Sequence, residues 1–279
     1  MTTLRYGDTG ADVRTLQNRL NTVASAGLSV DASYGAATEA AVRAFQASTG
    51  LVADGIAGPK TQAALLGTNT TPLLKGSDLV SAAERLGVPV AAVYAVNEVE
   101  SAGSGFLSNG KPKILFERHI MYRQLCAVRH DGDDAAELKK HADELAAQYP
   151  TLVNPQYGGY IGGTGEYQRL AQAQLIDDTA ALESASWGAF QIMGYHATRL
   201  GYDSVQAFAA AMASSESAQF DAFVRFILAD ANLLKALKAR KWADFAKLYN
   251  GPDYARNLYD VKLQRAYERY SSTTEGAAA

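Results

Sequence analysis

The stretch PVAAVYAVNEVESAG, residues 89–103, predicts an apolar helix that ends on a carboxylate and breaks into small residues. At helical spacing Glu100 shares a stripe with Val93 and Val96, whereas Glu98 points elsewhere. A carboxyl beside apolar side chains is costly to ionise, so its pKa rises and it can donate a proton near neutral pH. A polar residue at a fraying helix end has the same pattern, so the rest of the chain must decide between the two interpretations.

The composition is that of an ordinary folded protein. The chain has 279 residues, 48% of them hydrophobic and 20% charged, which is enough for two domains. A net charge of -3 and a pI near 5.8 argue against nucleic acid or an anionic membrane surface as partner. The single cysteine, Cys126, excludes an internal disulfide. We find no signal sequence and no apolar run of about 20 residues, so we expect neither export nor membrane insertion.

An internal repeat organises the N-terminal part. Residues 31–41 (DASYGAATEAA) and 54–64 (DGIAGPKTQAA) share Asp, Gly, Thr and Ala at the same offsets. Each copy predicts a tight turn that uses glycine, followed by a helix. Residues 13–20 add another helical pattern. We therefore predict a three-helix bundle over residues 1–66, and the stretch GTNTTPLLKGS, residues 67–77, as a linker.

The N-terminal sequence resembles the small peptidoglycan-binding domain of many cell-wall enzymes. The letters that carry the likeness are Gly10, Val13, Leu16, Gln17, Tyr34, Gly35, Thr38, Phe45, Gln46, Asp54, Gly55, Gly58 and Thr61. The resemblance implies binding of cell-wall peptide or glycan without a metal. Ala32 departs from the pattern, because the family often has glycine there. We expect Tyr34 in an exposed turn, as a candidate wall contact.

A second domain is expected over residues 78–270, followed by a flexible tail at 271–279. Within it, KILFERH, residues 113–119, reads as a short strand or helix start that ends in polar groups. Glu117 is the second carboxylate of interest, and an ion pair with Arg118 or a nearby base explains it equally well.

A Gly- and Tyr-rich loop is predicted over residues 150–165, ahead of a helix over 166–183. A loop of this length inside a domain is more often functional than not. Tyr157, Tyr160 and Tyr167 suit the stacking of sugar rings on aromatic faces, or a packed tyrosine cluster.

Three motifs in order sharpen the function. VESAGSGFLSNGKPKILFERH (residues 99–119), ESASWGAFQIMG (183–194) and Tyr249-Asn250-Gly-Pro look like the motif series of goose-type lysozymes and soluble lytic transglycosylases. The first run is similar to the N-acetylmuramidase domain of phage endolysins. The resemblance implies a mainly α, lysozyme-like catalytic domain behind the small N-terminal bundle.

The resemblance also implies a reaction and its residues. Glu100 would be the catalytic acid that cleaves the β-1,4 bond between N-acetylmuramic acid and N-acetylglucosamine, without a cofactor. Gln191 would hold substrate, and Tyr249 would orient Glu100. Further substrate contacts are expected from Ser101, Asn250, Tyr160 and, in the binding domain, Tyr34.

The second catalytic task stays open at this stage. Oxocarbenium stabilisation usually needs another carboxyl group, for which Glu117 is our first choice. The alternatives are Asp177, Asp178 and Glu183. Lytic transglycosylases, as a family, use one glutamate and replace water by the muramic 6-hydroxyl.

Other classes remain as alternatives. The chain has four histidines: His119, His130, His141 and His196. None forms a His-Glu-x-x-His pattern, which argues against a zinc amidase or peptidase. Cys126 lies inside an apparent helix, which argues against a cysteine peptidase. A wall-binding protein without catalysis is the non-enzymatic alternative.

The expected setting follows from the resemblance. The partner is bacterial peptidoglycan, and we expect a monomer. Without an export signal, such a protein would accumulate in the host bacterial cytoplasm. It would reach the periplasm and cell wall only after the membrane has been permeabilised.

Overall fold

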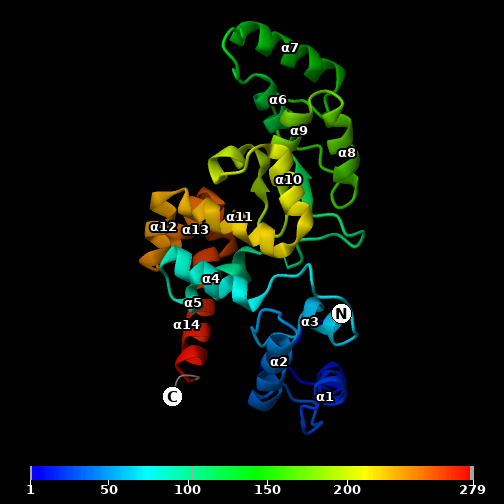
Figure 1. The fold of residues 1–279 in the computed structure, drawn as a ribbon, viewed down its shortest axis with the longest axis vertical. Coiled ribbons are helices and arrows are strands. Elements are labelled where there is room, and N and C mark those ends of the chain that lie inside the picture. The colour runs from blue at the N-terminus through cyan, green and yellow to red at the C-terminus, as the bar shows by residue number, and fades with distance from the viewer. Residues whose placement is uncertain (1, 102, 277–279) are drawn as a thin grey trace. The chain divides into compact units, whose positions relative to one another are not determined.

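The computed structural model describes residues 2–101 and 103–276 and is mainly helical, as predicted (Figure 1). Its α-helices are α1 (Ala11–Ala24), α2 (Ala36–Ser48), α3 (Pro59–Ala64), α4 (Gly76–Leu86), α5 (Val90–Glu100), α6 (Arg118–Leu125), α7 (Ala135–Gln148), α8 (Gly165–Gln174), α9 (Asp178–Glu183), α10 (Val205–Ser214), α11 (Glu216–Leu228), α12 (Ala231–Lys238), α13 (Trp242–Asn250) and α14 (Tyr259–Gly276). Short 3-10 turns cover Gly194–His196, Thr198–Leu200 and Pro252–Asn257.

One small antiparallel sheet completes the fold, with strands β1 (Ile114–Phe116), β2 (Ala185–Trp187) and β3 (Ile192–Met193) in the order β1-β2-β3. Ile114 pairs with Trp187. Helices α6 to α9 form the chain segment between β1 and β2, and α6 packs on α7 (Figure 1).

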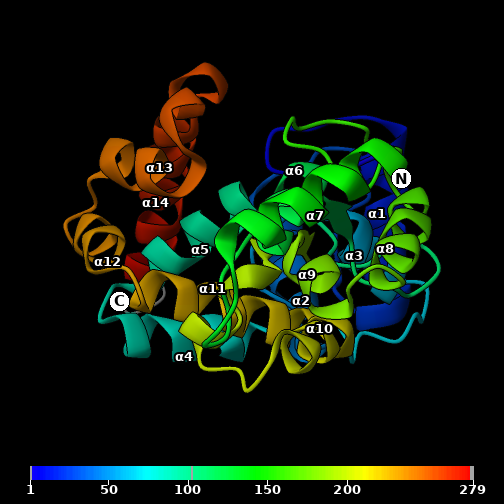
Figure 2. The ribbon, with the colours of Figure 1, turned by 90° about the horizontal axis from the view of Figure 1, so that it is seen from above.

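Packing divides the chain into two compact units. One contains residues 1–99 and 232–279, and the other contains residues 100–231. Within the first unit, α13 and α14 lie side by side (Figures 1 and 2). The predicted division into a binding module over 1–66 and a catalytic domain over 78–270 concerns function, and it stays a prediction.

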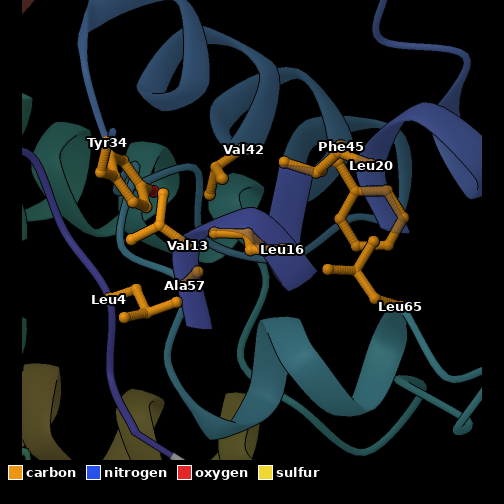
Figure 3. Packing of buried hydrophobic residues seen from close by; sticks show 9 residues of the cluster. All are labelled: Leu4, Val13, Leu16, Leu20, Tyr34, Val42, Phe45, Ala57 and Leu65. Atoms are coloured by element: carbon orange, nitrogen blue, oxygen red, sulfur yellow. The ribbon is translucent and has the colours of Figure 1, made fainter. Parts of the chain in front are cut away.

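The N-terminal module has its own apolar core (Figure 3). The core consists of Leu4, Val13, Leu16, Leu20, Tyr34, Val42, Phe45, Ala57 and Leu65. The expectation that Tyr34 is an exposed wall contact is wrong, because its side chain is only 1% exposed. Its hydroxyl donates to the carbonyl of Gly55 at 2.8 Å, which satisfies the polar tip of a buried ring.

A buried glutamine fastens the first repeated turn. Gln17 Nε2 donates to Asp31 Oδ1 at 2.7 Å, to the carbonyl of Ser33 at 3.0 Å and to Thr38 Oγ1 at 3.1 Å. Gln17 Oε1 accepts from the N–H of Ala32 at 3.0 Å. One amide therefore joins α1 to the turn and to the start of α2.

The second repeated turn uses the same device. Gln46 Nε2 donates to Asp54 Oδ1 at 2.7 Å, and to the carbonyl of Ile56 and Thr61 Oγ1 at 3.0 Å each. Its Oε1 accepts from the N–H of Gly55 at 2.9 Å. The Asp and Thr of the sequence repeat are thus the partners of a buried amide, which explains their fixed spacing.

Two predicted boundaries need correction. The linker was expected to extend through residue 77, but α4 begins at Gly76, and Lys75 pairs with Leu51 in an isolated bridge. The tail was expected to begin at residue 271, yet α14 continues to Gly276. Leu263 and Tyr270 are buried along this helix, so the helix is already nucleated and the following residues only need to extend it.

The helix expected over residues 166–183 is interrupted. It consists of α8 and α9, separated at residues 175–177. Asp177 is the N-cap of α9 and its carboxylate accepts from the N–H of Ala180 at 2.7 Å, which favours a new helix start there.

The helix that ends on Glu100 forms as predicted. Val93 and Val96 are buried, and α5 ends at Glu100. Glu98 points to another side, where its Oε2 accepts from Tyr270 Oη at 2.6 Å and from Arg269. The two carboxylates of this helix end therefore have separate surroundings.

Membrane-spanning length is not found in any single described helix. Within the described part of the chain, α4 and α5 together have the length and apolar composition of a membrane span, but a bend of 116° separates them.

We predict that stability changes in opposite directions when the residue after the repeated Asp is substituted in the two copies, Ala32 by glycine and Gly55 by alanine. Ala32 has φ 62 and Gly55 has φ +71. The left-handed region costs a residue with a Cβ about 1 kcal/mol or more, so Ala32→Gly should raise the unfolding free energy by up to about 1 kcal/mol. Gly55→Ala should lower it by about 1–2 kcal/mol, since its Cβ would lie 2.8 Å from Arg43 Nε.

Both variants can be compared by urea unfolding of the full chain, with hydrogen exchange reporting on the amides of residues 4–65. Equal destabilisation by the two substitutions would contradict the shared geometry of the two turns.

Candidate functional site

The loop that follows Glu100 is anchored on α11. Glu216, which is 1% exposed, accepts from the N–H of Gly105 through Oε1 at 2.8 Å. Gln219 lies one turn later on α11 and donates to the carbonyl of Gly105 at 3.4 Å. A buried carboxylate and a buried amide thus hold both backbone groups of one glycine.

The same glutamine holds the turn between β2 and β3. Gln219 Oε1 accepts from the N–H of Ala189 at 2.8 Å. A Cβ at Gly105 would lie 1.9 Å from Gln219 Oε1, and one at Gly188 would lie 2.6 Å from Gln219 Cδ. Both glycines are therefore needed because the side chain of Gln219 fills the space between them.

Lys113, the residue before β1, connects these two segments through its backbone. The N–H of Lys113 donates to the carbonyl of Gly105, and the N–H of Gly188 donates to the carbonyl of Lys113, both at 2.8 Å. The loop after Glu100, the start of β1 and the turn before Gln191 consequently form one hydrogen-bonded framework.

Gln191 is presented at this turn in a strained conformation. Its φ is 50, which is unusual for a residue with a Cβ and is often found at functional sites. Its Oε1 accepts from Ser186 Oγ at 2.8 Å, and its Nε2 donates to the carbonyl of Gly188 at 2.8 Å. The residue is exposed, so a fixed amide faces solvent where substrate was expected to bind.

Glu117 lies at the other end of β1. Its Oε2 accepts from Tyr160 Oη at 2.7 Å and lies 3.2 Å from His119 Nδ1. Burial and this hydrogen bond raise the pKa of Tyr160 to about 12, so its hydroxyl stays a donor. The expected partner Arg118 donates elsewhere, to the carbonyls of Pro150, Gln156 and Tyr157. Two predicted site residues, Glu117 and Tyr160, are thus brought together.

The other candidate carboxylates make structural contacts. Asp177 caps α9, and Asp178 accepts from Gln174 and Gln206 at 2.8 Å each. Glu183 pairs with Arg129. Among the described residues, no group of three or more His, Cys, Asp or Glu side chains could hold a metal ion.

The remaining predicted residues lie at the ends of two helices and beside β1. Ser101 follows α5 directly and is half-buried. Tyr249 and Asn250 end α13, where the ring of Tyr249 stacks on Phe245 with centroids 6.1 Å apart. Tyr167 is packed, since its hydroxyl donates to the carbonyl of Pro112 at 2.9 Å.

A buried ion pair supports β1, and our sequence reasoning missed it. Glu166 and Arg169 pair at 2.7 Å. Burial alone would raise the pKa of Glu166, but hydrogen bonds from the N–H groups of Gly162, Ile161 and Phe116 and from Arg169 lower it on balance. The spacing of three residues was the available signal, though such pairs usually lie on the surface.

A groove of about 1120 Å³ lies on the N-terminal module. Its walls come from the end of α1, the following segment and one side of α2, and include the network residues Gln17, Asp31 and Thr38. Along α2 the groove is lined by small residues, among them Ala37, Ala41, Ala44 and Ser48.

Known proteins match both parts of the chain. Residues 89–271 match the N-acetylmuramidase family, and residues 9–65 match a peptidoglycan binding domain family. The crystal structure of a Burkholderia AP3 phage endolysin is similar, with 57% identity, a TM-score of 0.88, and coverage of 97% of this chain and 100% of that one.

A second relative matches the N-terminal module alone. The zinc D-Ala-D-Ala carboxypeptidase of Streptomyces albus G is 49% identical over 61 residues, which are 21% of this chain and 24% of that protein. The chain thus spans about a quarter of that relative's length.

We predict that removing the carboxylate of Glu216 impairs turnover through the loop after Glu100. Glu216→Ala leaves the buried N–H of Gly105 without its acceptor, so the loop shifts, and a displacement of about 1 Å can cost roughly a hundredfold in rate. Glu216→Gln keeps an acceptor oxygen and should retain most of the activity. Wall-lysis rates and thermal unfolding of both variants check this. Equal rates for Glu216→Ala and the parent, with both folded, would disprove the anchoring role.

Proposed function

The chain belongs to the N-acetylmuramidase family and carries a peptidoglycan-binding domain at its N-terminus, and from this premise we propose that it is an endolysin. It binds bacterial peptidoglycan and cleaves the β-1,4 bond between N-acetylmuramic acid and N-acetylglucosamine. The observation that carries the proposal is the position of Glu100. This residue ends α5 within the family match and is followed by a loop held through Gly105.

Glu100 acts as the general acid in this proposal. The C-terminal end of a helix carries partial negative charge, which favours the protonated form of a carboxyl located there. The proton passes to the leaving glycosidic oxygen, as the reaction requires. Fixing the next loop at Gly105 limits the conformations of the chain that follows Glu100, which lowers the entropic cost of orientation.

Gln191 and Tyr249 serve substrate and acid in the same scheme. The amide of Gln191 is fixed by Ser186 and Gly188, so it meets an N-acetyl or hydroxyl group of the sugar without further ordering. Tyr249 orients Glu100, and Ser101 and Asn250 contribute substrate contacts.

Glu117 is the proposed second carboxylate for hydrolysis. The competing acids at 177, 178 and 183 are engaged in capping, hydrogen bonding and an ion pair, as described above. Glu117 is oriented by Tyr160 and remains beside an exposed loop.

Lytic transglycosylation is the second candidate, and one observation favours it. Glu117 Oε2 accepts from Tyr160 Oη at 2.7 Å and lies 3.2 Å from His119 Nδ1. A carboxylate that is engaged in this way suits sugar positioning better than direct attack. In that case Glu100 works alone and the muramic 6-hydroxyl replaces water.

We predict that Glu100→Gln lowers wall lysis by roughly a hundredfold or more, because the amide cannot donate the proton. Glu98→Gln, two residues away on the same helix, keeps an acceptor for Tyr270 and should lyse at about the parent rate. Turbidity loss of purified peptidoglycan measures both. A folded Glu100→Gln variant with the parent rate would refute the assignment.

The mass of the released fragments separates the two reactions. Hydrolysis yields reducing muramic ends, whereas transglycosylation yields 1,6-anhydro products that are lighter by one water. If neither product is released and the chain still co-sediments with the wall, the protein binds peptidoglycan without cleaving it.

We further propose that the groove along α2 holds the wall. Ala44→Trp should abolish co-sedimentation of the chain with peptidoglycan, because the indole fills the groove. Ala47→Trp is the matched control, since Ala47 is exposed on the same helix and does not line the groove. Equal binding by the two variants would show that the wall binds elsewhere.

A further inference from the structure

An exposed aromatic segment stands out beside Glu117. We define the tyrosine loop as residues 156–161, between α7 and α8. Tyr157 is 78% exposed and Ile161 is 67% exposed, while the hydroxyl of Tyr160 donates a hydrogen bond to Glu117. Two large apolar side chains are thus exposed within one six-residue loop, and exposed apolar groups that lie together often form a binding surface.

The backbone of this loop is fixed at its beginning. The guanidinium of Arg118 donates to the carbonyls of Gln156 at 2.9 Å and Tyr157 at 3.0 Å, and also to the carbonyl of Pro150 at 3.1 Å. Gly159 follows with φ +78, a backbone conformation that residues with a Cβ rarely adopt. Glycine at this position therefore lets the loop turn beside the guanidinium of Arg118.

The end of the loop is fixed as well. The N–H groups of Ile161 and Gly162 donate to Glu166 Oε1 at 2.7 and 2.9 Å. Glu166 is fully buried and paired with Arg169, which also donates to the carbonyl of Phe116 in β1 at 2.8 Å. The exposed side chains of Tyr157 and Ile161 therefore project from an ordered backbone. Binding of a ligand then loses little conformational entropy in the backbone of the loop.

Polar groups lie at the base of the aromatic surface. The ring of His119 meets that of Tyr157 edge-on with centroids 6.5 Å apart. His119 Nδ1 lies 3.2 Å from Glu117 Oε2. An aromatic face next to a carboxylate and an imidazole suits a sugar ring, which has apolar C–H faces and a rim of hydroxyl groups.

We infer that the tyrosine loop, with Tyr157 as its platform, is an accessory glycan site that binds a sugar ring of the strand beyond the bond being cleaved. This inference rests on the proposed function. His119 contacts both Glu117 and Tyr157, so when Glu117 faces the bond being cleaved the ring on Tyr157 belongs further along the strand. The carboxylate at the base disfavours an anionic lipid surface as the ligand.

The test compares long and short substrates. In the full chain, Tyr157→Ala should raise KM for peptide-free glycan strands roughly three- to tenfold with kcat within twofold, and leave cleavage of short oligosaccharides unchanged. The fold is preserved because Arg118 holds the carbonyl of residue 157 and not its side chain. Tyr157→Trp keeps an aromatic face and should restore the parent KM. Tyr149→Ala, on another exposed tyrosine, should leave it unaltered.

A parent KM for Tyr157→Ala on long strands would overturn the inference while leaving the proposed cleavage intact. Binding gives an independent readout, since Glu100→Gln chains with and without Tyr157→Ala can be titrated with the same glycan strands. A three- to tenfold weaker affinity supports the site. Equal glycan affinity of the two chains contradicts the site. If Tyr157→Ala weakens binding to anionic lipid vesicles but not to glycan, the loop binds lipid and the inference is likewise wrong.

Discussion

Gln219, a buried amide on α11, is the side chain on which the proposed site depends. It donates to the carbonyl of Gly105 and accepts from the N–H of Ala189, so it joins the loop after Glu100 to the turn before Gln191. An unpaired amide in this position would cost free energy of desolvation, so the loops and α11 stabilise one another. A site for a large, flexible glycan then needs little ordering when substrate arrives.

The N-terminal module is built on the same physical principle. Gln17, Gln46 and Gln219 are each 1% exposed, and each amide both donates to and accepts from the backbone of turns or loops. A side-chain amide has a donor group and an acceptor group at one end, so it can satisfy both kinds of backbone group in a loop without regular secondary structure. Rigid loops on a mainly helical chain follow from this repeated use of glutamine.

The sequence predicted the features that depend on residues close together in the chain. The end of α5 at Glu100 and the repeated turns follow from periodicity and turn residues over about ten positions. For residues 113–119 the pattern left a strand or a helix start open, and the structure has β1 followed by the start of α6. The bond from Gly105 to Glu216 joins residues 111 apart, and no spacing rule anticipates it. The prediction for Tyr34 was wrong for a related reason. A tyrosine in a turn is expected to be exposed, and its burial depends on a hydrogen bond to the carbonyl of Gly55, which the local sequence does not reveal. The buried pair of Glu166 and Arg169 likewise reads as a surface pair.

Native-state hydrogen exchange of the Gly105 and Ala189 amides measures whether α11 holds the two loops. These two N–H groups are the ones that Glu216 and Gln219 hold. Both amides should exchange as slowly as the amides within α11, because they open only when that helix does. Exchange as fast as that of the exposed turn at residues 108–110 would contradict it, since the loop after Glu100 would then move independently of α11.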